Sequence, residues 1–150
     1  MRDGTIPSAV SNTGATSTAG AINDPFNHTD EFSSKVFSLP TGGTATASKV
    51  ATLQLNVRAP ANRVDIVPSH THTLLSGSKF SDAGYTAVYD DKEVNFYESH
   101  TINITEDTVL KGYRYPISTL WRVPLVPIME NINVVTILLD SPCGQKSTNN

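Results

Sequence analysis

The chain has 150 residues, enough for one domain with a real core, and a hydrophobic fraction of 38%, which is low for a compact globule. Its formal net charge is −3 and it has no run of Lys or Arg, so binding of nucleic acid through release of counterions is not indicated. The single cysteine, Cys143, excludes a disulfide framework and indicates a reducing compartment. Prolines and a glutamate interrupt the most apolar stretch, residues 123–139, which is too short to span a bilayer. We therefore expect one domain with polar, irregular ends.

The N-terminal region predicts one short strand and a loop. Residues 6–10 form an apolar approach to a turn that contains Gly14. Residues 20–34 show no clear period, and Asp24-Pro25 is a turn signal within them. We expect this second stretch to be irregular.

A long hairpin is predicted next. Residues 35–39 alternate apolar and polar side chains, as in a strand with one buried face. Pro40-Thr41-Gly42-Gly43 follows as a tight turn, and residues 44–57 continue as a second strand whose apolar and polar residues alternate toward its end. Two such runs around a turn of this composition are typical of a β-hairpin.

The middle of the chain predicts two strands and one helix. Residues 63–67 alternate and stop at Pro68, and residues 72–75 form a further short strand. Residues 76–84 predict the helix, because a serine can cap its start and Gly84 suits the left-handed position after its end.

The last third predicts more short strands. Residues 85–90 and 93–98 flank Asp91-Lys92 and predict another hairpin. Many short strands separated by turn signals, with one short helix, indicate an all-β sandwich or barrel. Further strands are expected at 100–105, 108–111, 120–125 and 133–139, followed by a disordered tail from Ser141.

Two segments carry the strongest functional signal. The first, Ala9-Val10-Ser11-Asn12-Thr13-Gly14-Ala15-Thr16, is an apolar strand that ends in a glycine-containing triplet. The second, residues 73–84, has two apolar residues and a glycine that opens the short helix. The predicted hairpin with a glycine tip lies between them. This ordered series resembles the retropepsin-like aspartic proteases, in which the triplet is Asp-Thr-Gly; here its first residue is Asn12.

The resemblance extends along the chain, which is similar to the protease region of Pol polyproteins from copia-type LTR retrotransposons. It covers residues 6–125, and residues 126–150 are expected to be a polyprotein linker or tail with little order. Residues 35–42 look like the flap hairpin of these proteases, and residues 63–68 followed by 74–77, and 82–89, are similar to further segments of copia-type proteases. Residues 110–114 with 120–125 look like the segment where such polyproteins pass toward the integrase region.

The resemblance implies an all-β, retropepsin-like closed barrel or sandwich and an enzyme made of two identical chains. Each chain gives one triplet loop to a site on the two-fold axis, where two carboxylates share one proton. One carboxylate acts as general base on a water, and the other donates a hydrogen bond to the scissile carbonyl. The implied substrate is the retroelement's own polyprotein, processed inside the cell, in the cytoplasm or the retroelement particle. No metal, cofactor, membrane or nucleic acid is expected to take part.

The site residues follow from the same resemblance. The implied catalytic residues are Asn12 in place of the aspartate, Thr13, whose hydroxyl braces the loop, and Gly14, which lets the backbone approach the substrate. The implied substrate-binding residues are Ala15, Thr41, Gly42, Gly43, Leu75, Ser76 and Gly77.

Asn12 removes the central step of this mechanism. A neutral amide cannot take a proton from water, so the chain as written is expected to be inactive. Engineered inactivation and decay of a genomic copy both explain its presence. Because Asn is nearly isosteric with Asp, the alternative function is a dimer that binds peptide without cutting it. A third hypothesis is that the resemblance is accidental and the chain is an unrelated β domain. Four other acids, Asp3, Asp24, Asp65 and Asp82, lack the triplet context, and the last two are expected to face solvent or to cap.

Weaker constellations have simpler interpretations. His70 and His72 lack a third ligand for zinc, and a polar loop explains them better. The acidic cluster at 90–93 is expected to be a solvated hairpin turn. Trp121, with its apolar neighbours, is expected to be part of a packing strand.

Overall fold

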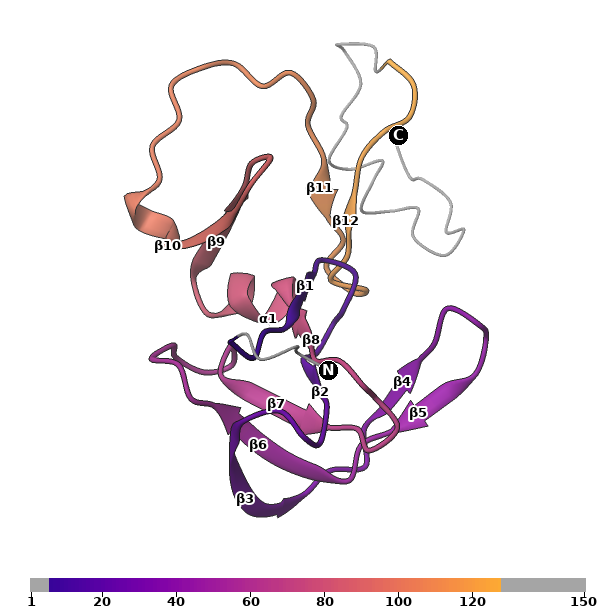
Figure 1. The fold of residues 1–150 in the computed structure, drawn as a ribbon. Helices are drawn as coiled ribbons and strands as arrows, with labels where there is room; N and C mark the ends of the chain where they lie inside the picture. Colours follow the sequence, from indigo (N-terminus) through magenta and orange to yellow (C-terminus); the bar gives the residue numbers. More distant parts are fainter. Residues whose placement is uncertain (1–5, 128–150) are drawn as a thin grey trace. The chain divides into compact units, whose positions relative to one another are not determined.

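The computed structural model describes residues 6–127 (Figure 1). Its contacts divide the chain into two units, Met1–Ile102 and Asn103–Asn150, and each is taken by itself. Residues 6–127 are predominantly β, as predicted, with one short α-helix. None of the helices between residues 6 and 127 has the length and apolarity needed to cross a membrane. Whether a protease-like domain ends at residue 125 stays a prediction.

The first unit is built on a six-stranded sheet with the order β1-β8-β2-β7-β6-β3 (Figure 1). The pairs β1–β8 and β2–β7 are parallel, and the other neighbours are antiparallel. Among residues 6–127, β1 and β3 each have a neighbour on one side only, so the sheet is open and the predicted closed barrel is wrong. The strands are β1 Val10–Asn12, β2 Ala19–Gly20, β3 Phe26–Phe32, β6 Lys49–Leu53, β7 Arg63–Ile66 and β8 Leu74–Ser76.

The loop expected at residues 20–34 is wrong, because it contains strand β3. This strand lies at the edge of the sheet and pairs only with β6, with a shift of register between His28 and Phe32. Almost all of its residues are exposed, so it has no buried face to give the sequence an apolar period. Backbone pairing, rather than burial, therefore holds it in place.

The predicted hairpin is present as β4 (Val36–Ser38) and β5 (Thr44–Thr46). Its turn closes through two hydrogen bonds, from the Leu39 N–H to the Gly43 carbonyl and from the Gly42 N–H to the Leu39 carbonyl, both 2.9 Å. Gly42 has φ +95°, a conformation that favours glycine. The long second strand predicted at 44–57 is divided, because the chain leaves β4 after Ala47 and joins β7 as β6.

The predicted helix and the hairpin after it are confirmed. Helix α1 spans Gly77–Asp82, and Gly84, with φ +89°, follows its end. Strands β9 (Tyr85–Tyr89) and β10 (Val94–Glu98) pair antiparallel. The Asp90 carboxylate accepts the N–H groups of Lys92 and Glu93 at 2.7 and 2.8 Å, which orders the hairpin turn.

The strands predicted at 100–105 and 108–111 are wrong. Ser99–Thr101 is a 3-10 helix, η1, and the following residues have no partner strand, so β-branched composition alone produces no strand there. In the second unit, β11 (Tyr113–Arg114) pairs antiparallel with β12 (Trp121–Arg122), which falls within the predicted strand at 120–125. The strand predicted at 133–139 lies outside the described residues.

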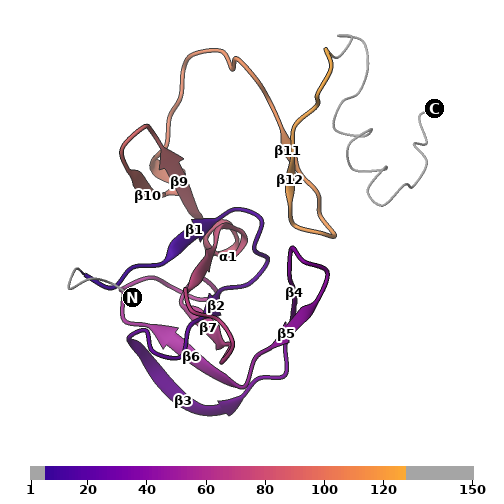
Figure 2. The same ribbon diagram turned by 45° about the vertical axis from the view of Figure 1, so that its right-hand side comes forward.

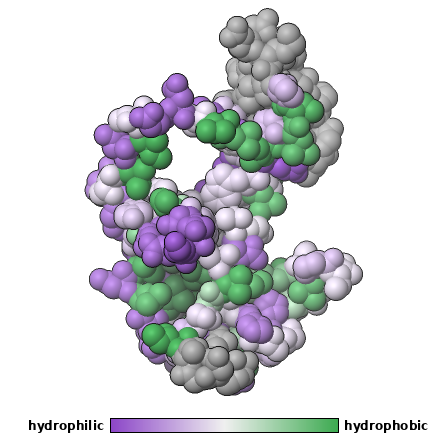
Figure 3. All heavy atoms as spheres, turned by 45° about the horizontal axis from the view of Figure 1, so that its top comes forward, coloured by the Kyte–Doolittle hydropathy of each residue, from purple (hydrophilic) through white to green (hydrophobic). Residues whose placement is uncertain are grey.

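Alanine is the commonest buried residue in the core clusters of the first unit. One cluster, around Ala61, Phe80 and Ala83, holds α1 against the β9–β10 hairpin, with the rings of Phe80 and Phe96 4.7 Å apart. Many large apolar side chains are exposed to solvent, and hydrophobic residues form several separate patches on the surface shown in Figure 3. The other two clusters consist of Ala19, Ala45, Ala47 and Val67, and of Ala51, Val64 and Ile66.

Candidate functional site

The Asn12 turn lies beside the segment that opens α1, although Asn12 and Ser76 are 64 positions apart in sequence. Strands β1 and β8 run parallel, with Asn12 opposite Ser76. The approach is close, because a Cβ atom added to Gly77 would lie 3.4 Å from the Thr13 Cα. The structure therefore brings Asn12-Thr13-Gly14 together with Leu75-Ser76-Gly77.

The Asn12 side chain shapes its own turn. Its Oδ1 accepts the N–H of Gly14 at 2.8 Å, and its carbonyl accepts the N–H of Ala15 at 3.4 Å. Asn12 is half-buried, while Thr13 and Gly14 are exposed. An aspartate in this position could accept the same Gly14 N–H, so the turn geometry does not depend on the amide. The remaining amide group, an NH₂, donates hydrogen bonds and cannot accept a proton from water.

Hydrogen bonds of buried hydroxyl groups hold the Asn12 turn in place. The Ser76 hydroxyl donates to the Ala15 carbonyl at 2.6 Å and accepts the Lys79 N–H at 3.1 Å. The Ser76 N–H in turn donates to the Thr18 Oγ1 at 3.0 Å. Ser76 and Thr18 are both fully buried. Ser76 thus connects the exit of the turn to the first turn of α1, and Thr18 is a supporting residue that the Ser- and Thr-rich sequence does not distinguish from its neighbours.

The residues of the predicted flap lie at the tip of the β4–β5 hairpin, which projects from the sheet (Figure 2). Thr41, Gly42 and Gly43 are exposed, and a Cβ atom added to Gly42 would meet nothing within 4 Å. In Figure 1 the tip stands apart from the Asn12 turn. A single chain therefore brings together the two loop segments of the predicted site but not its flap.

A pocket of about 410 Å³ lies on the other side of β1. Ser11 and Leu75 line it, but Asn12 does not, because successive residues of a strand point to opposite faces. At its edge the Asp24 carboxylate accepts the Thr73 hydroxyl at 2.6 Å. Sequence reasoning missed this pocket because its walls come from separate segments, whose apolar members include Ile6, Pro7, Pro25, Phe26, Leu53, Leu55, Val94 and Phe96.

Comparison with protein-family models, with characterised proteins and with solved structures finds no match. The resemblance therefore depends on the motifs and on the contacts among the residues that carry them.

Among the other acids, Asp24 accepts the Thr73 hydroxyl, and Asp3 lies outside the described residues. Asp65 was expected to face solvent or to cap, and this is wrong: its side chain is 1% exposed. It accepts the Ser33 hydroxyl at 2.7 Å and an Arg63 guanidinium N–H at 3.0 Å. Asp82 is exposed in α1. Between residues 6 and 127, no three His, Cys, Asp or Glu side chains are grouped so that they could hold a metal ion.

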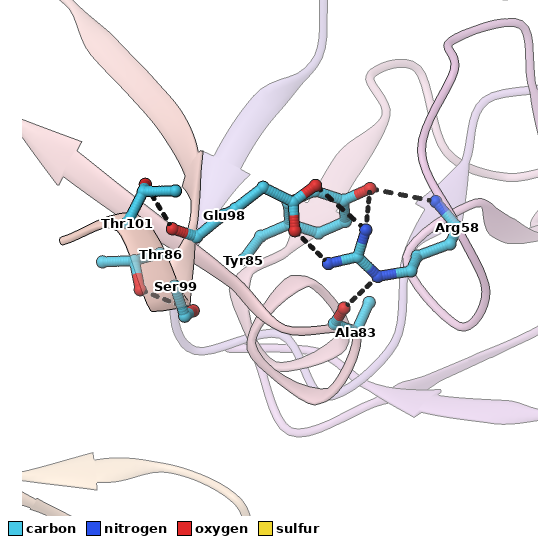
Figure 4. A network of polar contacts seen from close by, with 7 residues as sticks. All are labelled: Arg58, Ala83, Tyr85, Thr86, Glu98, Ser99 and Thr101. Carbon is cyan, nitrogen blue, oxygen red and sulfur yellow. Dashed lines mark hydrogen bonds and ion pairs between the residues drawn. The ribbon is translucent and has the colours of Figure 1, made fainter.

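An arginine network holds the end of α1 in place (Figure 4). The Arg58 Nε donates to the Ala83 carbonyl at 2.7 Å, and its Nη1 donates to the Glu98 carboxylate at 3.0 Å. The guanidinium also lies over the Tyr85 ring, 4.3 Å from its centroid. The hydrogen bond from Arg58 lowers the pKa of Glu98 from its ordinary value. Arg58 thus joins the loop before β7 to the helix and to both strands of the β9–β10 hairpin.

Proposed function

We propose that the chain is a retropepsin-like domain of a copia-type polyprotein, in which a second copy completes a peptide groove and Asn12 has removed the endopeptidase activity of the parent. The observation that supports this function best is the parallel pairing of β1 with β8, which sets the Asn12 turn against Gly77. Two sequence motifs that the resemblance assigns to one site are thus neighbours in the fold.

The chemistry of the parent needs one carboxylate from each chain. One carboxylate removes a proton from water, and the other, still protonated, donates to the scissile carbonyl. Two asparagines on the axis supply neither a base nor an acid, so the groove binds peptide without cleaving it. The chain as written then acts as a non-catalytic peptide-binding and dimerisation module.

Exposed apolar side chains near the turn support pairing with a second copy. Val10, next to the turn in β1, is 52% exposed, and Tyr89 and Tyr97 of the β9–β10 hairpin are 49% and 44% exposed. The Ser11 hydroxyl lies 2.6 Å from the Tyr89 hydroxyl, so the β9–β10 hairpin lies against β1. An isologous contact at the turn would cover Val10 on both copies.

The test is to restore the acid with Asn12→Asp. The variant should cleave peptides at acidic pH, with inhibition by pepstatin, at least about a hundredfold faster than the chain as written, as general acid–base catalysis allows. Asn23→Asp is the matched control, because it makes the same chemical change at an exposed position outside the turn. A variant that dimerises but cleaves nothing in a broad peptide library would contradict the enzymatic origin.

The unmodified chain needs a separate measurement. Sedimentation should show a dimer, and an extended peptide should bind to it with an affinity that Asn12→Asp leaves nearly unchanged. A monomer without peptide affinity would contradict the binding function, whatever the result with the restored acid.

A further inference from the structure

The β11–β12 hairpin of the second unit has a local excess of positive charge. The whole chain has a net charge of −3, but residues 108–127 include Lys111, Arg114 and Arg122 and no Asp or Glu. The cations are spaced along the sequence, so they do not form a run. Pairing of Tyr113 with Arg122 and of Arg114 with Trp121 gathers them on one short ribbon.

Each of these cations lies over an aromatic ring. The Lys111 ammonium is 5.5 Å from the Tyr113 centroid, and the Arg122 guanidinium is 4.9 Å from that of Tyr115. The Arg114 guanidinium is 4.9 Å from the Trp121 centroid. A ring positions a cation without neutralising it, because the attraction comes from the quadrupole of the ring and not from a negative charge.

The charge on the ribbon is accessible. Lys111 and Arg122 are exposed, and neither takes part in an ion pair with another residue of the described range 6–127. Trp121 is 40% exposed, although it was expected to belong to a packing strand. Lys111 and Arg122 therefore present accessible positive charge on the same ribbon as an accessible aromatic side chain.

We propose that the β11–β12 hairpin binds single-stranded nucleic acid, with phosphates on Lys111 and Arg122 and a base stacked on Trp121. Proteins that bind single strands combine positive charge with aromatic side chains in this way. The Tyr113–Arg122 and Arg114–Trp121 pairs face opposite sides of the ribbon, so an oligonucleotide that passes over its edge contacts Arg122 on one face and Trp121 on the other. An acidic peptide could use the cations, but it would leave the exposed tryptophan without a role. Nucleic acid therefore fits the ribbon better.

The chain contains its own reporter, because Trp121 is its only tryptophan. Titration of the full chain with oligothymidylate of about a dozen nucleotides, at low salt, should quench the tryptophan fluorescence as a base stacks on the ring. Binding without quenching, or no binding at low salt, would overturn the proposal. Equal or tighter binding of an oligoglutamate peptide would also overturn it and would favour an acidic protein partner.

Charge-removing variants test the phosphate contacts. The double variant Lys111→Gln/Arg122→Gln should weaken binding about tenfold and reduce the slope of log K against log salt by about 1.4, since each phosphate contact on a single strand contributes about 0.7. The matched control is Lys49→Gln/Lys92→Gln, which removes two exposed lysines from the first unit and should leave both values unchanged. If the two double variants weakened binding equally, binding would depend on the net charge of the chain and not on the β11–β12 hairpin, and the proposal would be overturned.

The stacking contact has its own test. Trp121→Ala should weaken binding with little change in the salt slope, and Trp121→Phe should recover part of the affinity because a ring remains. Circular dichroism of each variant checks that the fold is kept. An alanine variant that binds as tightly as the original chain would remove Trp121 from the site.

Discussion

Gly20 lies in β2 at a point where neighbouring strands leave no room for a side chain. An added Cβ would overlap the Val64 side chain and would lie 3.0 Å from a ring carbon of Phe26. Gly20→Ala should therefore destabilise the fold by about 1–3 kcal/mol through overpacking. Gly43→Ala is the control, because its Cβ would meet only Leu39, at 4.0 Å. Urea unfolding of both variants measures the difference, and equal midpoints would contradict the close packing of β2.

At the same scale, the sequence identifies residues that belong to a motif and misses those that act through burial. The motif predicts that Asn12 and Gly77 are neighbours, and the pairing of β1 with β8 brings their segments together, while their roles stay a prediction. The burial of Asp65 could not be found from alternation, since β7 is an interior strand with Val64, Asp65 and Ile66 all buried. Whether a polar residue in such a strand faces solvent depends on partners such as Ser33, which lies 32 positions away.

Among the elements, α1 depends on one hydroxyl group. Ser76→Ala removes the cap of the helix and leaves the half-buried Ala15 carbonyl without its donor, so it should cost about 2–4 kcal/mol of unfolding free energy. Ser81→Ala, inside the same helix, should change it by less than about 0.5 kcal/mol. Denaturant unfolding distinguishes the two. If both serines cost the same, the hydroxyl would not be what connects the Asn12 turn to the helix.

The β9–β10 hairpin should respond to acid through Glu98. The pKa of Glu98 is lowered by the hydrogen bond from Arg58, so its stabilising effect is present above the unfolded pKa of about 4.3 and is lost as the pH falls through the lower folded pKa. Glu98→Gln should therefore lose less stability than the original chain between pH 7 and pH 3. Asp90, whose pKa is also lowered, remains in both proteins, so the variant keeps part of the acid response. Identical pH profiles would contradict the Arg58 contact.

Elements with local signals could be predicted from the sequence, and elements held by distant partners could not. The β4–β5 and β9–β10 hairpins and α1 have turn or capping residues in the sequence itself. Strand β3 has polar, exposed residues and exists because β6 lies beside it. Conversely, the β-branched residues after η1 predicted strands that find no partner among the described residues.

In the whole molecule, the tip of the β4–β5 hairpin and the open edges of the sheet are the features that a second chain would have to complete under the proposed function. The all-β class follows from the number of short strands and turns. The arrangement of the sheet edges does not, because strand order depends on pairings between segments far apart in sequence, such as Val10 with Leu74. The groove of the proposed function also depends on a second chain, which no pattern within one sequence describes.

The division into two units gives the last prediction. The three core clusters all lie between Ala19 and Phe96, and the six strands of the sheet all precede Ile102. A chain that ends at Ile102 should therefore keep the β signal in circular dichroism and unfold cooperatively in urea, because its buried apolar contacts are retained. The same fragment lacks β11 and β12, so it should not bind oligothymidylate. Loss of the cooperative transition would show that the sheet needs residues beyond Ile102, whereas a folded fragment that still binds the oligonucleotide would place that site in the first unit.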